Sequence, residues 1–342
     1  MKTKKQNADF VHVGAQLLAW YKTNGRPLPF RKTKDPYTIW ISEIIFQQTR
    51  IEQGLGHYSR FIERFPDVNA LANADSDEVL LYWKGLGYYS RALNLHKAAQ
   101  KIVNAYGGVF PSQLSHILQL NGVGHYTAAA IASICYEERI PAVDGNFYRV
   151  LSRFFADDYD ISQSKAFRYF SELAMRMMPN DAPGHFNQAM MDLGSEICKP
   201  KNPQCGVCPL NEECMSFATG KMLDFPVKTK KVKITDLSLT YFFVEYGDQF
   251  LIRQRGDDFI WKKLYEFPTE VPPLFLAHCK HETTIRHQLT HKNLTIHVSR
   301  ITLDSEKEFL DFATAYGFMI SDLEHAKNRS FPKPLENYLE RL

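Results

Sequence analysis

The chain has 342 residues, of which 44% are hydrophobic and 23% are charged, which is the composition of a folded protein with more than one domain. No apolar run reaches the roughly 18–20 residues that span a membrane, and the lysine-rich N-terminus lacks the apolar stretch of a secretory signal. We therefore expect a cytoplasmic protein with no membrane partner. The net charge of +3 permits nucleic-acid binding without requiring it.

The first two thirds of the sequence predict helices joined by short turns, and no strand alternation precedes the cysteines. Asp35 and Pro36 suit the N-cap and the first position of one of these helices. Apolar residues recur at helical spacing in eight stretches, at residues 10–23, 35–48, 75–83, 89–106, 127–136, 144–155, 162–178 and 185–197. We predict an all-α region over residues 1–223.

The pattern changes after the last of the clustered cysteines. Residues 224–235 are polar and basic and contain a proline, which predicts a linker. Residues 238–246 and 249–255 alternate around Gly247-Asp248, which predicts a β-hairpin, and residues 294–303 predict a further strand. A final helix would place four apolar residues on one face, namely Leu335, Tyr338, Leu339 and Leu342. The region 236–342 is therefore predicted to be a smaller α+β domain.

Four of the six cysteines lie within 17 residues, at Cys198, Cys205, Cys208 and Cys214. In a cytosolic chain such a group indicates a metal centre rather than disulfides. Structural zinc sites usually pair two Cys-x2-Cys motifs, and only one is present here. A compact loop of four thiolates also suits a [4Fe–4S] cluster. The spacing favours the cluster slightly and leaves zinc open.

A glycine turn, Gly122-Val123-Gly124, lies between two predicted helices. Such a turn can present backbone N–H groups at a helix start, where they bind an anion. This is the layout of a helix-hairpin-helix that holds a DNA phosphate without reading sequence. The pattern alone is equally consistent with an ordinary turn between helices.

Two carboxyl groups occupy contrasting positions. Glu43 is the only charged residue in an apolar helix, so burial should raise its pKa towards that of a general acid, unless a buried cation pairs with it. Asp144 begins a helix, where the helix N-terminus favours the ionised form, although an N-cap is the commonest role of such an aspartate. An acid and a carboxylate with pKa values shifted in opposite directions suit cleavage of a glycosidic bond.

In combination these features resemble the A/G-specific adenine DNA glycosylase (MutY) family within the endonuclease III superfamily. The resemblance extends over nearly the whole chain. Its most specific segments are Ser42-Glu43, Gln47-Gln48-Thr49, residues 85–92 (GLGYYSRA), the glycine turn, Val143-Asp144-Gly145-Asn146, residues 186–194 (FNQAMMDLG) and the four cysteines.

The resemblance implies removal of adenine paired with 8-oxoguanine. Glu43 would protonate adenine N7 and later activate water, and Asp144 would stabilise the sugar cation or form a transient covalent bond. Asn146 would orient both groups. Tyr126 stands where related bifunctional glycosylases carry a lysine nucleophile, which implies a monofunctional enzyme. Ordinary aromatic packing is the alternative for Tyr126.

The resemblance also assigns contacts to DNA and to the extruded base. Gln48 and Tyr88 would insert into the base stack, with Leu86 on the same surface, although a Gly-Tyr-Tyr sequence alone would favour core packing. The residues expected to line the adenine pocket are Arg26, Leu28, Phe30 and Arg31, with Phe30 where many members have tryptophan. Further expected binding residues are Thr49, Gly87, Gln188 and the turn Gly122, Val123 and Gly124.

The C-terminal region resembles the Nudix-like 8-oxoguanine-recognition domain of the family, through residues 251–255 and 261–268. No glutamate-rich segment for Mg²⁺ follows, so we predict recognition rather than phosphate hydrolysis. Leu289-Thr290-His291 matches the loop that many members write Phe-Ser-His. Thr290 keeps the hydroxyl and His291 the imidazole, whereas Leu289 loses the aromatic ring. Without the resemblance, His291 would be an ordinary solvated histidine.

The resemblance thus implies three modules: a six-helix helix-hairpin-helix module over 27–137, a cluster module from 1–26 plus 138–223, and the Nudix-like domain at 236–342 after the linker. It implies one [4Fe–4S] cluster per chain with a structural and DNA-positioning role, and a monomer that binds double-stranded DNA containing an adenine:8-oxoguanine pair.

The main alternative is a related glycosylase for mispaired thymine or an oxidised pyrimidine, but Tyr126 and the recognition-like C-terminal region argue against its lyase version. The presence of Glu43, Asp144 and Asn146 together argues against a non-catalytic damage sensor. The lack of metal-binding carboxylates argues against a nucleotide hydrolase.

Overall fold

The computed structural model describes residues 10–230, 233–257 and 259–342, which form two compact units. Unit 1 contains residues up to 72 and 97–230, and unit 2 contains residues 73–96 with the C-terminal residues from 233 onwards. The segment 73–96 lies within the region predicted from sequence to be one helical part, yet its contacts group it with the C-terminal residues. The module boundaries expected from the sequence stay a prediction.

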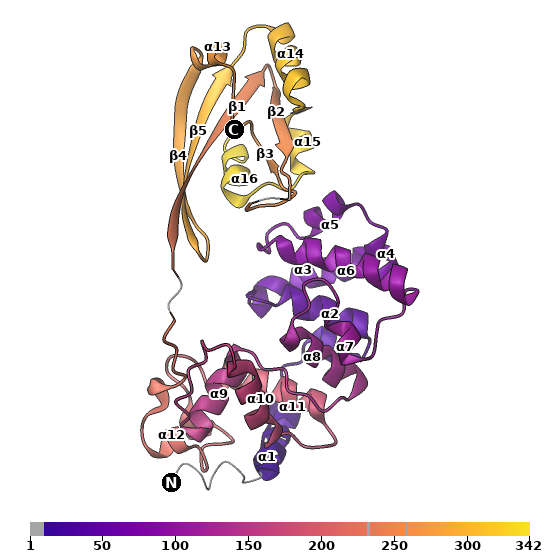
Figure 1. Ribbon diagram of the computed structural model, residues 1–342, viewed down its shortest axis with the longest axis vertical. Coiled ribbons are helices and arrows are strands. Elements are labelled where there is room, and N and C mark those ends of the chain that lie inside the picture. Colours follow the sequence, from indigo (N-terminus) through magenta and orange to yellow (C-terminus); the bar gives the residue numbers. More distant parts are fainter. Residues whose placement is uncertain (1–9, 231–232, 258) are drawn as a thin grey trace. The chain divides into compact units, whose positions relative to one another are not determined.

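The regular elements among the described residues of unit 1 are all helices (Figure 1). Its α-helices are α1 (Val11–Asn24), α2 (Pro36–Ile45), α3 (Ile51–Arg64), α4 (Val68–Ala72), α7 (Leu114–Ile117), α8 (His125–Tyr136), α9 (Gly145–Phe155), α10 (Ala166–Met175), α11 (Pro183–Asp192) and α12 (Met215–Ala218). A 3-10 turn covers Pro29–Lys32, and a π-helical turn, Leu193–Ile197, extends α11.

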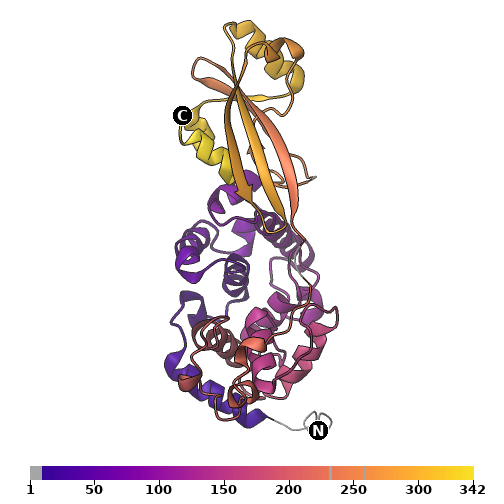
Figure 2. The same cartoon turned by 90° about the vertical axis from the view of Figure 1, so that its left-hand side faces the viewer.

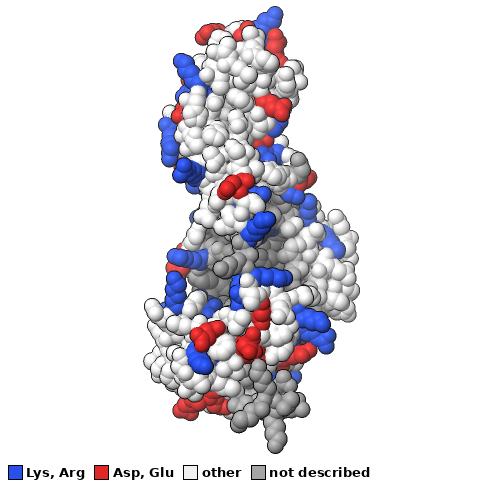
Figure 3. All heavy atoms as spheres, turned by 60° about the vertical axis from the view of Figure 1, so that its left-hand side comes forward, with Lys and Arg blue, Asp and Glu red and all other residues white. Residues whose placement is uncertain are grey.

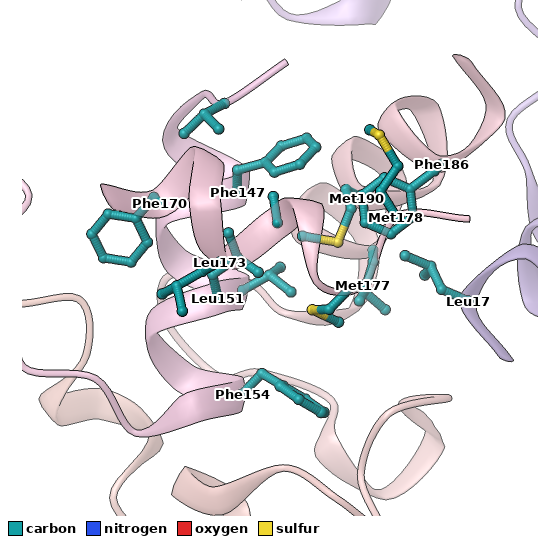
Figure 4. Close-up of a cluster of buried hydrophobic side chains, with 14 of the residues drawn as sticks. Leu17, Phe147, Leu151, Phe154, Phe170, Leu173, Met177, Met178, Phe186 and Met190 are labelled. Carbon is teal, nitrogen blue, oxygen red and sulfur yellow. The ribbon is translucent and has the colours of Figure 1, made fainter. Parts of the chain in front are cut away.

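Helices α1, α9, α10 and α11 share one hydrophobic core, shown in Figure 4. Leu17, Phe147, Phe170 and Phe186 are fully buried there, so the apolar faces of four helices meet at one centre. Burial of such side chains stabilises a fold by about 1.5–3 kcal/mol each. Three of the clustered cysteines, Cys198, Cys208 and Cys214, pack against this core, which ties the cysteine loop to it.

Unit 2 combines a mixed sheet with helices. The strands are β1 (Thr235–Tyr246), β2 (Gln249–Gln254), β3 (Tyr265–Glu266), β4 (Cys279–Gln288), β5 (Lys292–Thr302) and β6 (Met319–Ser321). Their order is β3-β2-β1-β5-β4, with β6 on β2, and the long strands β1, β5 and β4 run side by side (Figure 2). The helices are α5 (Ser76–Tyr82), α13 (Pro273–Leu276), α14 (Glu306–Tyr316), α15 (Leu323–Lys327), α16 (Lys333–Leu339) and the start of α6 (Ser90–Tyr106), which continues into unit 1.

The predicted hairpin is confirmed, because β1 and β2 pair antiparallel around Gly247, which has a φ of 57°. Strand β1 also pairs in parallel with β5, from Thr235↔Lys292 to Glu245↔Thr302, a long-range pairing that the sequence did not reveal. An all-α region followed by an α+β region agrees with the fold class predicted from the sequence.

Several boundaries differ from the prediction. Helix α2 ends at Ile45 rather than near Gln48, since Gln48 has a φ of 56° that an α-helix cannot contain. Helix α3 was missed although Ile51, Leu55, Tyr58 and Phe61 recur at helical spacing, and strand β4 was missed because polar residues obscure its alternation. Leu342 was placed wrongly on the apolar face of the last helix. It follows the end of α16 and is 42% exposed, whereas Leu335 and Tyr338 are buried.

No helix among the described residues is long and apolar enough to cross a bilayer. On the face shown in Figure 3, lysine and arginine side chains are interspersed with acidic ones. This mixture fits the small net charge of +3. Any polyanion partner would therefore be held by local groups rather than by a strongly basic protein.

Candidate active site and nucleic-acid contacts

Glu43 lies on α2, whose other side chains are largely buried, including Trp40, Ile44 and Ile45. The Tyr126 hydroxyl, from the first turn of α8, donates a hydrogen bond of 2.5 Å to Glu43 Oε2. The pKa of Glu43 is raised to about 7. Burial raises this pKa most and Asp144 also raises it, while the Tyr126 hydrogen bond and the Arg31 charge lower it. Glu43 can therefore hold and release a proton near neutral pH.

Asp144 is the N-cap of α9 and accepts three hydrogen bonds. The backbone N–H groups of Asn146 and Phe147 donate to Oδ1 at 2.8 and 2.9 Å, and the Asn146 side-chain amide donates to Oδ2 at 2.8 Å. The expectation that the helix start would shift the pKa of Asp144 downwards is wrong. Burial raises this pKa, and the three donors and the nearby Arg149 charge offset the rise only in part.

Glu43 and Asp144 therefore differ in the hydrogen-bond donors that they meet, and not in the direction of their pKa shifts. Glu43 accepts one phenolic hydrogen bond, whereas Asp144 accepts three N–H hydrogen bonds that favour its charged form. The charge of Asp144 raises the pKa of Glu43. The charges of Glu43 and Asp144 both raise the pKa of Tyr126, which therefore stays protonated and can donate a hydrogen bond.

Asn146 is fixed from two sides. Its side-chain oxygen accepts a hydrogen bond of 2.8 Å from Arg149, and its amide donates to Asp144. A Cβ at Gly194 would lie 2.5 Å from the Asn146 Cβ, so this glycine allows the close approach. Arg149 also donates to the Gly194 and Cys198 carbonyls, each at 2.7 Å. Arg149 and Gly194 were not predicted as site residues from the sequence, although Gly194 closes the motif of residues 186–194.

Two of the expected adenine-pocket residues meet at a buried carboxylate. Arg31 binds Asp192 with both of its terminal nitrogens, at 2.6 and 2.8 Å, and Arg26 Nε donates to the same carboxylate at 2.7 Å. The Asp192 side chain is fully buried. Burial would raise the pKa of Asp192, but Arg31 and Arg26 outweigh it and lower that pKa. Asp192 was not predicted as a site residue, although it is the only acid in α11 and lies in the motif of residues 186–194.

A cavity of about 280 Å³ lies beside this ion pair and is lined by Arg31, Ser133, His185 and Gln188, among others. Gln188 is buried and accepts a hydrogen bond of 2.9 Å from the Tyr21 hydroxyl. Glu43 and Asp144 do not line this cavity. Leu28 and Phe30 are buried as well, and the Phe30 ring packs on Phe46 and Tyr58. The structure thus places Leu28 and Phe30 in the core, while Arg31 both lines the cavity and influences Glu43.

The glycine turn connects α7 to α8. Gly122 has a φ of 74°, which favours glycine, and Gly124 is the N-cap of α8. The Val123 side chain is buried, and its N–H already donates to the Leu120 carbonyl at 3.2 Å. A phosphate at this turn would therefore bind to the N–H groups at the start of α8 rather than to that of Val123.

Gln48 and Tyr88 share an unusual backbone. Each has a positive φ, 56° and 47°, although neither is glycine, and Tyr88 is 51% exposed. Such conformations are uncommon and concentrate at functional sites. The preceding Gln47 donates to Thr127 at 3.0 Å, and the Thr49 hydroxyl contacts the Gln47 carbonyl at 3.4 Å, which together hold the turn that presents Gln48 in unit 1.

Leu86 was wrongly expected on the inserting surface, because only 6% of it is exposed. It anchors the turn instead, and its carbonyl accepts a hydrogen bond from Arg91 at 3.1 Å. Gly87, with a φ of 69°, presents its carbonyl to Trp83 Nε1 at 3.0 Å. The buried Leu86 and Trp83 thus hold the turn from which Tyr88 projects.

The loop Leu289-Thr290-His291 connects β4 and β5 in unit 2. Thr290 and His291 are exposed, whereas Leu289 packs partly against the hydrophobic core of this unit. The Thr290 hydroxyl lies 2.7 Å from the Tyr88 hydroxyl. The leucine in place of an aromatic residue therefore contributes to packing, and two hydroxyl groups meet at the exposed tip.

The four clustered cysteines line one pocket in unit 1. Four thiolates around one pocket are the donor set that a [4Fe–4S] cluster takes. Arg153 is 3% exposed and donates to the Cys198 sulfur at 3.4 Å and to the Lys199 carbonyl at 2.8 Å. Within the described residues its hydrogen bonds go to carbonyl oxygens and this sulfur, which ties the buried guanidinium to the cysteine loop.

Three family models match the chain: the HhH-GPD superfamily of base excision DNA repair proteins at residues 41–176, the iron–sulfur binding domain of endonuclease III at 198–214, and the NUDIX domain at 240–341. Together with the site, they define the class as a helix-hairpin-helix DNA glycosylase with a [4Fe–4S] cluster. The adenine DNA glycosylase of Buchnera aphidicola subsp. Acyrthosiphon pisum is 33% identical over 95% of both chains. The chain therefore belongs to the adenine DNA glycosylase family, the MutY family.

Other similarities cover smaller parts of the chain. The human adenine DNA glycosylase is 37% identical over 60% of this chain and 40% of its own. A thermostable thymine-DNA glycosylase of known structure is 30% identical, with a TM-score of 0.57, over 64% of this chain and 99% of that one. An endonuclease III–DNA complex shares the fold alone, at 20% identity and a TM-score of 0.53 over 61% and 95% of the two chains.

Proposed function

We propose that this chain hydrolyses the N-glycosidic bond of adenine paired with 8-oxoguanine, or more slowly with guanine, in duplex DNA, and leaves the strand intact. The proposal rests mainly on the hydrogen bond from Tyr126 to Glu43. The pKa of Glu43 is raised to about 7, and the charge of Asp144 contributes to this rise. An acid next to a carboxylate is what departure of a base from a sugar cation requires.

In the proposed reaction, protonated Glu43 donates its proton to adenine N7. The C1′–N9 bond breaks, its electron pair goes to N9, and neutral adenine leaves with hydrogen on N7. The oxocarbenium-like sugar faces the ionised Asp144, which Asn146 and Phe147 hold by three N–H donors. Water then adds to C1′ and gives a proton back to Glu43, which restores the acid.

Tyr126 limits the reaction to base removal. A lysine at this position could form a Schiff base with the sugar and cut the strand, whereas a phenol cannot. Burial and the two carboxyl groups raise the pKa of Tyr126 well above its usual range, so it remains a neutral donor.

The cluster would be held by four cysteines, Cys198, Cys205, Cys208 and Cys214. When bound, it would supply a covalent tie that fixes their loop on the hydrophobic core.

Base selection is assigned to both units. Gln48 in unit 1 and Tyr88 in unit 2 would enter the base stack from their positive-φ turns, which offsets the stacking lost when adenine is extruded. Thr290 and His291 would hydrogen-bond the edge of the base left opposite the gap. The start of α8, at the glycine turn, would hold a phosphate.

The first experiment is single-turnover cleavage of duplexes with one adenine opposite 8-oxoguanine, guanine or thymine, developed with alkali. The wild type should give alkali-dependent cuts, fastest opposite 8-oxoguanine, and Glu43→Gln should be slower by about 10²–10⁴-fold. Glu43→Gln should still bind the duplex, which separates chemistry from binding.

Three results would reject the proposal in different ways. Cutting without alkali would show that another residue supplies lyase chemistry. Release of thymine from a G:T duplex, with none of adenine, would favour a thymine-specific enzyme like the structural relative. Equal rates opposite 8-oxoguanine and guanine would remove the assigned specificity and leave an adenine glycosylase.

A further inference from the structure

Asp77, at the start of α5, forms three hydrogen bonds to the C-terminal part of unit 2. Its Oδ2 accepts hydrogen bonds from the Tyr265 hydroxyl at 2.5 Å and from Arg329 at 2.9 Å. Its Oδ1 accepts one from Gln254 at 2.6 Å. Three partners from separate parts of the C-terminal region therefore converge on one carboxylate.

The partners of Asp77 are themselves held in place. Tyr265 is 4% exposed and belongs to the hydrophobic core of the sheet. Arg329 donates a second hydrogen bond to the Tyr265 hydroxyl at 2.8 Å, and its guanidinium lies over the Tyr265 ring at 4.9 Å. Burial and Asp77 raise the pKa of Tyr265 to about 12, so the phenol remains a donor at neutral pH. The carboxylate thus meets a preorganised pair of donors.

Two further contacts follow along the same segment. Lys84 Nζ lies 2.7 Å from Oε1 of Glu336, a residue of α16 that is 8% exposed. The Tyr88 hydroxyl lies 2.7 Å from that of Thr290. Residues 77, 84 and 88 therefore attach to three different places in the C-terminal region, and several separate attachments fix both position and orientation.

We infer that Asp77 is a positioning residue that sets the loop 289–291 against Tyr88, and so determines how strongly the enzyme prefers adenine opposite 8-oxoguanine to adenine opposite guanine. The inference rests on the proposed function. Asp77 does not touch the base in this scheme. It holds the sheet, which carries Thr290, against the segment 73–96, which carries Tyr88. Tyr88, which enters the base stack, and Thr290, which contacts the opposite base, therefore act at one point.

The physical reason for assigning this role to Asp77 is the nature of the contacts. They are polar and partly exposed, with 25% exposure at the Asp77 side chain and 35% at Arg329. Exposed pairs of this kind are individually weak, and interfaces built from them can open and close. Loss of the residue with three partners should therefore loosen the arrangement without unfolding either side.

The test compares Asp77→Ala with the wild type by single-turnover rates on A:8-oxoguanine and A:G duplexes. We expect the ratio of the two rates to fall by roughly threefold to tenfold, while the A:G rate stays within about twofold, because the chemistry groups of unit 1 are untouched. Arg329→Ala, which breaks the contact from the other side, should give the same loss. The double variant should be no worse than either single variant.

Asp311→Ala provides a matched control, since it removes an exposed acid from α14, outside the set of Asp77 partners. It should leave the ratio unchanged. A wild-type preference that survives in both Asp77→Ala and Arg329→Ala would overturn the inference and leave the proposed function standing. A wild type without any preference would overturn the proposed specificity, and this inference with it. Equal slowing on both duplexes in Asp77→Ala would indicate a structural role only and would also overturn it.

Discussion

The residues assigned to catalysis in unit 1 are buried, whereas the residues assigned to recognition in unit 2 are exposed. In unit 1, Glu43, Asp144 and Asp192 are held by buried or half-buried partners at short distances. In unit 2, the residues assigned to recognition, Tyr88 and Thr290, are exposed and meet through one hydroxyl contact. Chemistry depends on a fixed low-dielectric environment, whereas recognition needs groups that a nucleic acid can reach. Substitutions at the buried acids of unit 1 should therefore alter stability, pKa and rate, and substitutions at the exposed recognition residues of unit 2 should alter preference.

The largest effect on stability is expected from Asp192→Asn. The variant leaves Arg26 and Arg31 without their shared carboxylate, and loss of one member of a buried ion pair costs about 3–5 kcal/mol. The pKa of Asp192 is lowered, so this stabilisation is present above the ordinary aspartate pKa and disappears as the pH falls below it. Denaturant unfolding measures the loss. Glu196→Gln is the control, since Glu196 is 51% exposed and lies 3.8 Å from Arg26, and it should change stability little.

The next effect concerns pH and Glu43. Its pKa is raised to about 7, so the protonated acid is lost as the pH rises, and single-turnover adenine release should fall about tenfold per unit well above pH 7. Because the folded-state pKa exceeds the unfolded value, stability from this group is complete below the ordinary glutamate pKa and is lost as the pH rises through about 7. The loss is on the order of 3 kcal/mol. The free energy of unfolding should be measured at pH 5 and pH 8. Relative to the wild type, Glu43→Gln should be more stable at pH 8 than at pH 5. The same difference in free energy at both pH values would contradict a buried acid at position 43.

A smaller effect is expected when the hydrogen-bond donor to Glu43 is removed. Tyr126→Phe removes the hydrogen bond that lowers the Glu43 pKa, so the fall of the rate with pH should move upwards by about one unit. The matched control is Tyr136→Phe on the same helix, α8, whose hydroxyl contacts only the Phe110 carbonyl among its hydrogen bonds within the described residues, at 3.4 Å. It should leave the profile in place. An unshifted profile in Tyr126→Phe would show that the phenol does not tune the acid.

The two regions also differ in how much their sequences revealed. Periodicity and capping residues were sufficient for most helices and for the β1–β2 hairpin, because these are local features. The pairing of β1 with β5 and the grouping of residues 73–96 with the sheet are long-range, and a single sequence holds no local signal for them. Glu43 was located correctly as a lone acid in an apolar helix. Asp192 was missed because its helix also contains His185, Asn187 and Gln188, which hide a lone buried acid. The predicted direction of the Asp144 pKa shift was wrong because burial outweighs the helix start.

The smallest effect is expected from Thr290→Val, which keeps the shape of the side chain and removes its hydroxyl. Thr290 is exposed and contacts Tyr88, so stability and the rate on A:G duplexes should change little. The preference for 8-oxoguanine should fall by about threefold to tenfold, the equivalent of one hydrogen bond. Thr290→Ser retains the hydroxyl and should restore the preference in the same single-turnover assay. If valine and serine behave alike, the hydroxyl plays no part in recognition, and the exposed tip of unit 2 would act through its shape and through Tyr88 instead.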